Sequence, residues 1–289
     1  MKRVLGVNTW VWVSPLTDES LDDIARRAAA MGFEALELPV ENPGDWDPAR
    51  AADLLAELDL QPFVVGAMGV GRDLVHAPDA TIAATRQYLS HCIGVASTLG
   101  ATVVAGPFTA QTGRTWRMSP DERATTIAQL RTSLAPLVDA AVDAGVTLAI
   151  EPLNRYETSL VNTVEQALDA LGPLLGPGLG LALDSYHLNI EEKHPYDAIR
   201  IAGRNLAHVQ VCGNDRGAVG DDHIDWRAFL DALDEIGYAG PLNLESFTAH
   251  NETIATAASI WRPLAESQDA LAQRTLTYLT GLQDERYPT

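Results

Sequence analysis

The sequence predicts a (β/α)8 barrel that forms a single domain over residues 1–289. Three observations support this fold class. Eight short apolar runs alternate with eight helix-like segments along the chain. Most runs are continuously apolar, as is typical of parallel strands that are covered on both faces. The first run continues into Asn8-Thr-Trp-Val-Trp, which lacks the glycine-rich phosphate loop that a doubly wound sheet would need.

The elements follow one another in regular order. The expected strands are residues 4–11, 35–40, 62–68, 101–107, 146–153, 179–186, 206–212 and 241–247. The expected helices are residues 21–31, 48–60, 79–99, 120–144, 164–175, 191–203 and 225–236, and a long C-terminal helical segment from 252 to about 282. Apolar residues at helical spacing, with glycines such as Gly32, Gly100 and Gly145 at the ends, support these helices.

Composition excludes several classes of protein. The formal net charge is −19, so a phosphate backbone would be repelled and nucleic acid is not an expected partner. No run of 18 apolar residues and no signal peptide is present, so neither a membrane span nor secretion is expected. Cys92 and Cys212 are too few for a disulfide framework, which favours free thiols in a reducing compartment, the cytoplasm.

Four of the apolar runs end on a polar residue that carries a side-chain oxygen. These residues are Glu151, Asp184, Gln210 and Glu245. A buried carboxylate needs a partner because an unpaired charge is costly to remove from water. The carboxyl ends of all barrel strands meet at one face, so the four side chains can converge there. Oxygen ligands of this kind favour Mn²⁺ or Mg²⁺, although any one of these acids alone could instead cap a helix or pair with an arginine.

Three further polar residues lie in the loops that follow these strand ends. Glu157, His187 and Arg216 are six, three and six residues beyond Glu151, Asp184 and Gln210. Each could be a surface group or part of a local ion pair. Their position on the face where barrel enzymes carry out their chemistry makes them candidate substrate-binding residues. The loops 66–74 and 109–117 are expected to set specificity, with Met68, Phe108 and Trp116 as candidates to line the pocket.

Several motifs together resemble the xylose isomerase-like superfamily of sugar isomerases and epimerases, and among them the D-tagatose 3-epimerase/D-allulose 3-epimerase group. The motifs are Glu151-Pro-Leu-Asn-Arg-Tyr-Glu157, the LDSYHLNIEE run over 183–192, Asn214-Asp-Arg-Gly217 with Asp225-Trp226, and Glu245-Ser-Phe247. The resemblance spans nearly the whole chain. It implies a metal-dependent enzyme that acts on a small sugar or keto-sugar and assembles as a homodimer or homotetramer.

The resemblance also implies roles for individual residues. Glu151 and Glu245 would be both metal ligands and the catalytic acid/base pair, and Asp184 would be the third carboxylate ligand. Glu157, His187 and Arg216 would hold the substrate. One glutamate would remove the proton from carbon 3 of a ketose to give a cis-enediolate, and the other would return a proton to the opposite face. The metal would be Mn²⁺ or Mg²⁺, with Co²⁺ as a further candidate.

The chain departs from the epimerase pattern at two places. Gln210 stands where most of the group has a histidine ligand, and His208 lies two residues earlier on the same face of the strand, deeper in the barrel. Gly213 stands where those epimerases carry an acid. Glutamine here resembles the hydroxypyruvate isomerase branch, so the same enolisation of hydroxypyruvate, an inosose or a keto-glycoside remains an alternative. A non-catalytic sugar-binding protein is a further one, whereas the charge argues against a DNA-repair endonuclease.

Overall fold

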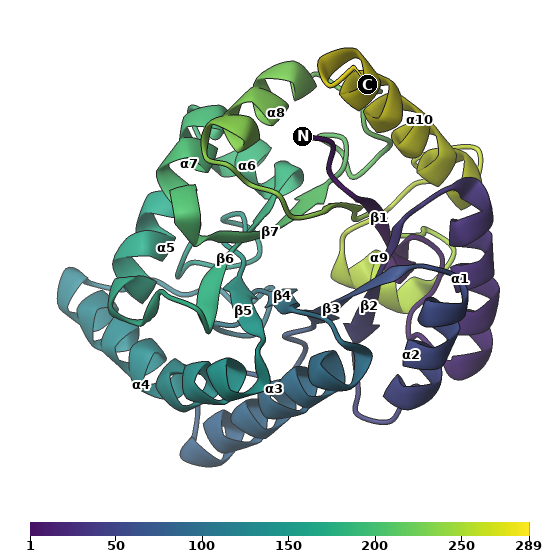
Figure 1. The fold of residues 1–289 in the computed structure, drawn as a ribbon. Coiled ribbons are helices and arrows are strands. Elements are labelled where there is room, and N and C mark those ends of the chain that lie inside the picture. Colours follow the sequence, from purple (N-terminus) through teal and green to yellow (C-terminus); the bar gives the residue numbers. More distant parts are fainter. Residues whose placement is uncertain (289) are drawn as a thin grey trace.

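The computed structural model describes residues 1–288 as a closed barrel of eight parallel strands in the order β1 to β8, with β1 pairing with both β2 and β8. The helices form a ring around this barrel, which Figure 1 shows down its axis. The strands are β1 (Leu5–Asn8), β2 (Ala35–Val40), β3 (Gln61–Gly66), β4 (Val103–Gly106), β5 (Thr147–Ile150), β6 (Leu179–Asp184), β7 (Leu206–Val211) and β8 (Leu242–Leu244). The predicted (β/α)8 fold is therefore confirmed.

The expected strands are longer than the observed ones where the chain turns at the carboxyl end. The run 4–11 divides into β1 and a 3-10 helix, η1 (Thr9–Val11), because the Asn8 side chain accepts a hydrogen bond from the backbone N–H of Trp10. The run 179–186 ends at Asp184, whose side chain accepts from the N–H of Tyr186 and begins the next helix. At both places a polar side chain ends the strand and starts a helical turn.

The helices cover the outside of the barrel. They are α1 (Asp18–Met31), α2 (Pro48–Glu57), α3 (Asp79–Leu99), α4 (Pro120–Ala144), α5 (Val164–Leu171), α6 (Ser185–Glu191), α7 (Pro195–Ala202), α8 (Trp226–Glu235), α9 (Glu252–Ala257) and α10 (Gln268–Arg286), with 3-10 turns η2 (Gly172–Leu174) and η3 (Gly203–Asn205). Two expectations were wrong in detail. The segment 191–203 belongs to two helices, α6 and α7, and the long C-terminal segment is divided into α9 and α10.

Small apolar side chains fill one layer of the barrel interior. Ala35, Ala105, Ala149 and Ala182 pack there against Phe63. Because side chains alternate along a strand, the next inward position of three of these strands carries an acid: Glu37, Glu151 and Asp184. The apolar layer thus supports a polar region on the carboxyl side of the barrel.

The opposite end of the barrel is held by contacts between the two ends of the chain. Arg3 is almost fully buried and donates to Asp234 of α8 at 2.7 Å and to the Tyr238 carbonyl at 3.0 Å. Gln283 of α10 bonds to both the N–H and the carbonyl of Arg3. The N-terminus and α10 accordingly lie side by side in Figure 1. Among residues 1–288, no helix has the length and apolar character that crossing a membrane requires.

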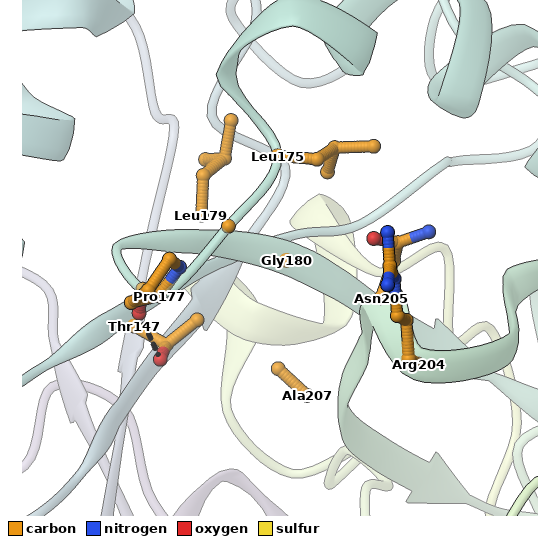
Figure 2. Close-up of a pocket in the computed structure, with 9 residues that line it drawn as sticks. Thr147, Leu175, Pro177, Leu179, Gly180, Arg204, Asn205 and Ala207 are labelled. Carbon is orange, nitrogen blue, oxygen red and sulfur yellow. Dashed lines mark hydrogen bonds between the residues drawn. The ribbon is translucent and has the colours of Figure 1, made fainter.

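A pocket of about 370 Å³ lies at this amino-terminal end, where β5, β6 and β7 begin. Figure 2 shows the residues that line it. Thr147 donates a hydrogen bond to the Pro177 carbonyl at 2.9 Å within it. Arg204 is the one charged side chain among its lining residues. Chemistry in barrel enzymes is found at the other face, where the strands end.

Candidate active site

The four polar residues at the strand ends converge, as the sequence predicts. Glu151 follows β5, Asp184 ends β6, Gln210 lies in β7 and Glu245 follows β8. The register pairs Asp184 with Gln210 in neighbouring strands. Gln210 Nε2 donates to Glu245 Oε1 at 2.8 Å, and all four residues are buried.

Arg216 lies among these carboxylates rather than at the rim. Its Nη1 donates to Asp184 Oδ2 and, at 2.8 Å, to Glu245 Oε2. The guanidinium lies over the rings of Tyr186 and Phe247, with its central carbon 4.2 and 5.1 Å from their centroids. The loop brings it there through a left-handed backbone conformation at Arg216, with φ of 70°. An ion pair with neighbouring acids, one of the alternatives for this residue, is therefore present.

His187 is held in one tautomer by a backbone group. The N–H of Asn154 donates to His187 Nδ1 at 3.0 Å, so the proton of the neutral ring is on Nε2. Burial, followed by the charge of Arg216, lowers the pKa of His187 to about 4 and keeps the ring neutral at pH 7. With its proton there, Nε2 can donate only to an acceptor such as Glu151 Oε1, which lies 3.4 Å away. Arg216 Nη2, 3.2 Å from the same nitrogen, is also a donor, so the two do not hydrogen-bond in this tautomer.

This tautomer determines what His187 can do. Atoms of Glu151, Asp184 and His187 lie within 4.8 Å of one another, a spacing that could hold a cation. A ring nitrogen that carries a proton cannot ligate a metal, however, and the N–H of Asn154 is fixed in the backbone. We therefore regard His187 as a hydrogen-bond donor rather than a ligand.

Glu157 and His187 face one pocket of about 490 Å³, together with Glu151, Arg216 and Glu245. Asn154 Nδ2 donates to Glu157 Oε1 at 2.7 Å and so links Glu157 to the His187 loop. The rest of the lining is largely apolar and includes Trp10, Val65, Met68, Leu153, Phe247 and Ile254. Two other candidates pack elsewhere: Phe108 against Gly66 and Gly106, and Trp116 against His76.

Both glutamates at the mouth of the barrel hold protons more tightly than usual. Burial raises the pKa of Glu151, and the charges of Glu245 and Asp184 raise it further. Burial also raises the pKa of Glu245; Arg216 opposes this change and Asp184 adds to it, and the pKa remains well above its ordinary value. Desolvation and neighbouring like charges are a common arrangement for acid/base groups.

The residues fit a divalent cation on two grounds. Three carboxylates and the Arg216 guanidinium leave a formal charge of −2. Glu151 Oε1 and Gln210 Oε1 are buried and have no hydrogen-bond partner among the described residues, 1–288. Buried polar atoms are normally paired, and carboxylate and amide oxygens are the donors that Mn²⁺ and Mg²⁺ prefer.

The sequence reasoning did not identify Glu37, although the structure places it directly beside Gln210. Glu37 lies inside β2, is fully buried and accepts from Gln210 Nε2 at 2.8 Å. His208, predicted to lie deeper in the barrel, donates to the other oxygen of Glu37 at 2.6 Å. An acid within the apolar run ALELPV is the available signal, but Glu37 lies inside the strand, whereas the other buried acids of this site lie at strand ends.

Comparisons with known proteins agree with this geometry. Residues 25–271 match the family model described as xylose isomerase-like TIM barrel. The chain is 31% identical to an L-ribulose 3-epimerase of Mesorhizobium japonicum over 98% of this chain and 95% of that one. It is 29% identical to a ketose 3-epimerase of Arthrobacter globiformis over 95% of each.

A solved structure shows the same overall fold. It is the crystal structure of D-allulose 3-epimerase from Methylomonas sp. in complex with D-allulose, with a TM-score of 0.87 and 28% identity. The alignment covers 99% of this chain and 98% of that one. The chain belongs to the xylose isomerase-like TIM barrel family.

Proposed function

We propose that the protein is a divalent-metal-dependent ketose 3-epimerase. The observation that carries this proposal is the pair Glu151 and Glu245, both buried, both with raised pKa values, and both lining one pocket from β5 and β8. Strands β5 and β8 are not neighbours in the barrel, so the two carboxylates approach a substrate from different sides. Relatives along nearly the full chain are named as ketose or L-ribulose 3-epimerases.

In the proposed reaction the two glutamates carry the proton. One removes it from carbon 3 of the ketose to give a cis-enediolate, and the other delivers a proton to the opposite face and inverts the configuration. A carboxyl group with a raised pKa suits both steps, because efficient general acid–base catalysis needs a pKa near the working pH. The same residues in exchanged roles carry the reverse reaction.

Other residues hold the substrate and the charge that develops on it. His187 Nε2–H donates to a substrate oxygen that gains negative charge, and Arg216 and Glu157 bind hydroxyl groups of the sugar. Glu151, Asp184, Gln210 and Glu245 would hold the cation, which we propose is Mn²⁺ or Mg²⁺, with Co²⁺ as a further candidate. Such an ion supplies Lewis-acid stabilisation of an enolate oxygen.

A second candidate is the same enolisation on hydroxypyruvate, an inosose or a keto-glycoside. The amide of Gln210, in place of the histidine of most of the epimerase group, favours it. One relative, a 3-dehydro-D-guloside 4-epimerase of Escherichia coli, is 31% identical over 37% of this chain. The proton chemistry would be shared, so the substrate alone separates the two candidates.

Proton exchange into a substrate tests both candidates in one experiment. Metal-stripped protein is reloaded with Mn²⁺ and incubated in heavy water with D-fructose, D-tagatose, D-allulose, L-ribulose or hydroxypyruvate, and the products are read by NMR. Deuterium at carbon 3 together with a new ketose is the expected result. Exchange on hydroxypyruvate alone would establish the second candidate. Binding of a ketose without any exchange would contradict the epimerase proposal for that ketose, and absence of exchange on all five compounds would direct the same assay to inososes and keto-glycosides.

We also propose that the chain forms a homodimer or homotetramer in the cytoplasm. Trp261 exposes 74% and Tyr156 76% of its surface, and both are large side chains that a subunit contact would cover. Cys92 and Cys212 are both buried free thiols, in accord with a reducing compartment. Light scattering of the purified protein should give a multiple of the 31.1 kDa chain mass, and a monomer at micromolar concentration would contradict the assembly.

A further inference from the structure

Glu37 is a buried carboxylate that the proposed reaction does not use. It accepts four side-chain hydrogen bonds from three strands. Oε2 accepts from Asn8 Nδ2 of β1 at 2.6 Å and from Gln210 Nε2 of β7 at 2.8 Å. Oε1 accepts from His208 Nε2 of β7 at 2.6 Å and from Asn243 Nδ2 of β8 at 3.2 Å. Both oxygens are therefore occupied, and no surface of Glu37 is exposed.

The amide of Gln210 lies between this carboxylate and Glu245. Its Nε2 donates to Glu37 Oε2 and to Glu245 Oε1, each at 2.8 Å. An amide nitrogen has two N–H groups, and here each has a carboxylate acceptor. Turning the amide over would place its oxygen against two carboxylate oxygens, which is electrostatically unfavourable. The orientation is thus determined, and Gln210 Oε1 faces away from both acceptors.

That oxygen is buried and has no hydrogen-bond partner anywhere in the described part of the chain. Of its two anchors, Glu37 is held by three further side-chain donors from the barrel strands β1, β7 and β8, whereas the other oxygen of Glu245 accepts from Arg216, which lies in a loop. Glu37 is therefore the more firmly held of the two acceptors and the one that fixes the orientation of the amide.

We propose that Glu37 is a positioning residue that holds the Gln210 amide by its Nε2, leaves Oε1 without a protein partner, and so makes Oε1 available as an oxygen ligand for the cation. The inference rests on the proposed metal-dependent function. Groups that hold a ligand by hydrogen bonds typically change metal affinity by about 10- to 100-fold when they are removed. Loss of Glu37 should therefore weaken metal binding through Gln210, without direct contact with the ion.

The test is Mn²⁺ binding measured by calorimetry, which does not depend on turnover. Glu37→Met keeps the side-chain length and removes both acceptors, and should weaken Mn²⁺ binding by about 10-fold or more. Asn243→Ser is the matched control: it removes a bond to the other oxygen of the same carboxylate and leaves the Gln210 bond in place. Its Mn²⁺ affinity should stay within about twofold of that of the unaltered protein.

A double-mutant cycle separates positioning from general structural damage. In a Gln210→Ala background, Glu37→Met should have little further effect on Mn²⁺ affinity, because the group that Glu37 positions is gone. An equal loss in both backgrounds would overturn the inference. So would unchanged affinity in Gln210→Ala itself, since Gln210 would then not be a ligand. If Glu37→Met does not fold, Glu37→Asp, which withdraws the carboxylate by one methylene, is measured in the same cycle with the same expected direction.

The outcomes also separate this inference from the proposed function. Tight Mn²⁺ binding by the unaltered protein, with equal affinity in the Glu37 variants, would overturn the positioning role alone. Failure of the unaltered protein to bind Mn²⁺ or Mg²⁺ would overturn the metal-dependent function and this role with it.

Discussion

The barrel contains two buried polar clusters that differ in how their carboxylates are paired. The upper cluster, at the carboxyl ends of the strands, comprises Glu151, Asp184, Arg216 and Glu245 and has three carboxylates for one guanidinium. The lower cluster comprises Asn8, Glu37, His208 and Asn243, and its single carboxylate is surrounded by donors. Gln210 connects the two through Nε2.

The pKa of a buried glutamate shifts in opposite directions in the two clusters. Burial alone would raise the pKa of Glu37, but the charge and hydrogen bond of His208 and the bonds from Asn8 and Gln210 lower it below the ordinary value. In the upper cluster, burial and like charges raise the pKa of Glu151. A carboxylate that is surrounded by hydrogen-bond donors therefore stays ionised, whereas an acid without such donors can exchange a proton or bind a cation. The lower cluster therefore contributes to the stability of the barrel, and the upper cluster carries the groups that suit chemistry.

The largest expected effect is the loss of proton transfer in the upper cluster. Glu245→Gln should lower the rate of deuterium incorporation by about 10²- to 10⁴-fold, because an amide cannot transfer the proton. Some Mn²⁺ affinity should remain, since an amide oxygen can still coordinate. The measurement is NMR exchange on the ketose that is turned over by the unaltered protein.

Glu235→Gln provides the matched control for this prediction. Glu235, at the end of α8, is an exposed partner of Arg200 on α7 and is not among the residues that line the pocket. Its variant should keep full exchange activity. Retained turnover in Glu245→Gln would refute the assigned role of Glu245.

Replacing a buried carboxylate by a neutral side chain should change stability in opposite directions in the two clusters. In metal-free protein, Glu37→Met should lower the free energy of unfolding by about 3–5 kcal/mol, because it leaves buried donors without their acceptor. Glu151→Gln should leave it unchanged or raise it, because a neutral group relieves repulsion from Glu245 and Asp184. Urea unfolding at pH 8 measures both.

The stability effect of Glu151→Gln should depend on pH, and its direction follows from the raised pKa of Glu151. A raised folded-state pKa gives Glu151 a contribution that is full below the unfolded pKa of about 4.3 and is lost as the pH rises through the folded value. The advantage of Glu151→Gln should therefore grow from pH 5 to pH 8. A large stability loss in this variant at pH 8 would show that Glu151 is paired in the metal-free state.

Replacing Gln210, which connects the two clusters, should alter metal preference more than stability. Gln210→His should keep or raise affinity for Mn²⁺ and shift the preference toward Co²⁺ and Zn²⁺ by a factor on the order of ten, because imidazole nitrogen suits softer ions. Glu37 would be within reach to accept from the second ring nitrogen, as carboxylates commonly do beside ligating histidines. Competition calorimetry with these ions measures the preference, and identical preferences in the two proteins would exclude Gln210 as a ligand.

The sequence allowed the barrel and the convergence of Glu151, Asp184, Gln210 and Glu245 to be predicted, because the alternation of elements and the cost of burying a charge are local properties. Strand ends such as Asn8 were misplaced because a side-chain cap decides them. The position of Arg216 depends on a left-handed loop residue that no spacing rule reveals. Glu37 carried the same signal as the upper acids, but its four partners come from strands β1, β7 and β8 and can be known only from the register.

A third polar cluster surrounds Asp234 at the amino-terminal end of the barrel. We expect a substitution there to change stability less than one in the other two clusters. Burial opposes ionisation of Asp234, but bonds from Tyr287, Arg286 and Arg3 lower its pKa to about 2. Because the folded pKa lies below the unfolded value, its contribution is present above about pH 4 and is lost as the pH falls toward 2. Asp234 is about one-quarter exposed, so after solvent screening we expect Asp234→Asn to lower stability by about 1 kcal/mol at pH 7.

Urea unfolding of Asp234→Asn and of the unaltered protein at pH 7 and pH 3 checks this expectation. The difference between them should shrink at pH 3, whereas Asp197→Asn, which removes an exposed partner of Arg200, should change little at either pH. A difference that stays constant or grows as the pH falls would show that Asp234 acts by packing rather than by charge. In that case, of the three clusters, only the lower one would stabilise the barrel through an ionised carboxylate. The difference in carboxylate pKa between the lower and upper clusters would then depend on full burial of the donors around Glu37.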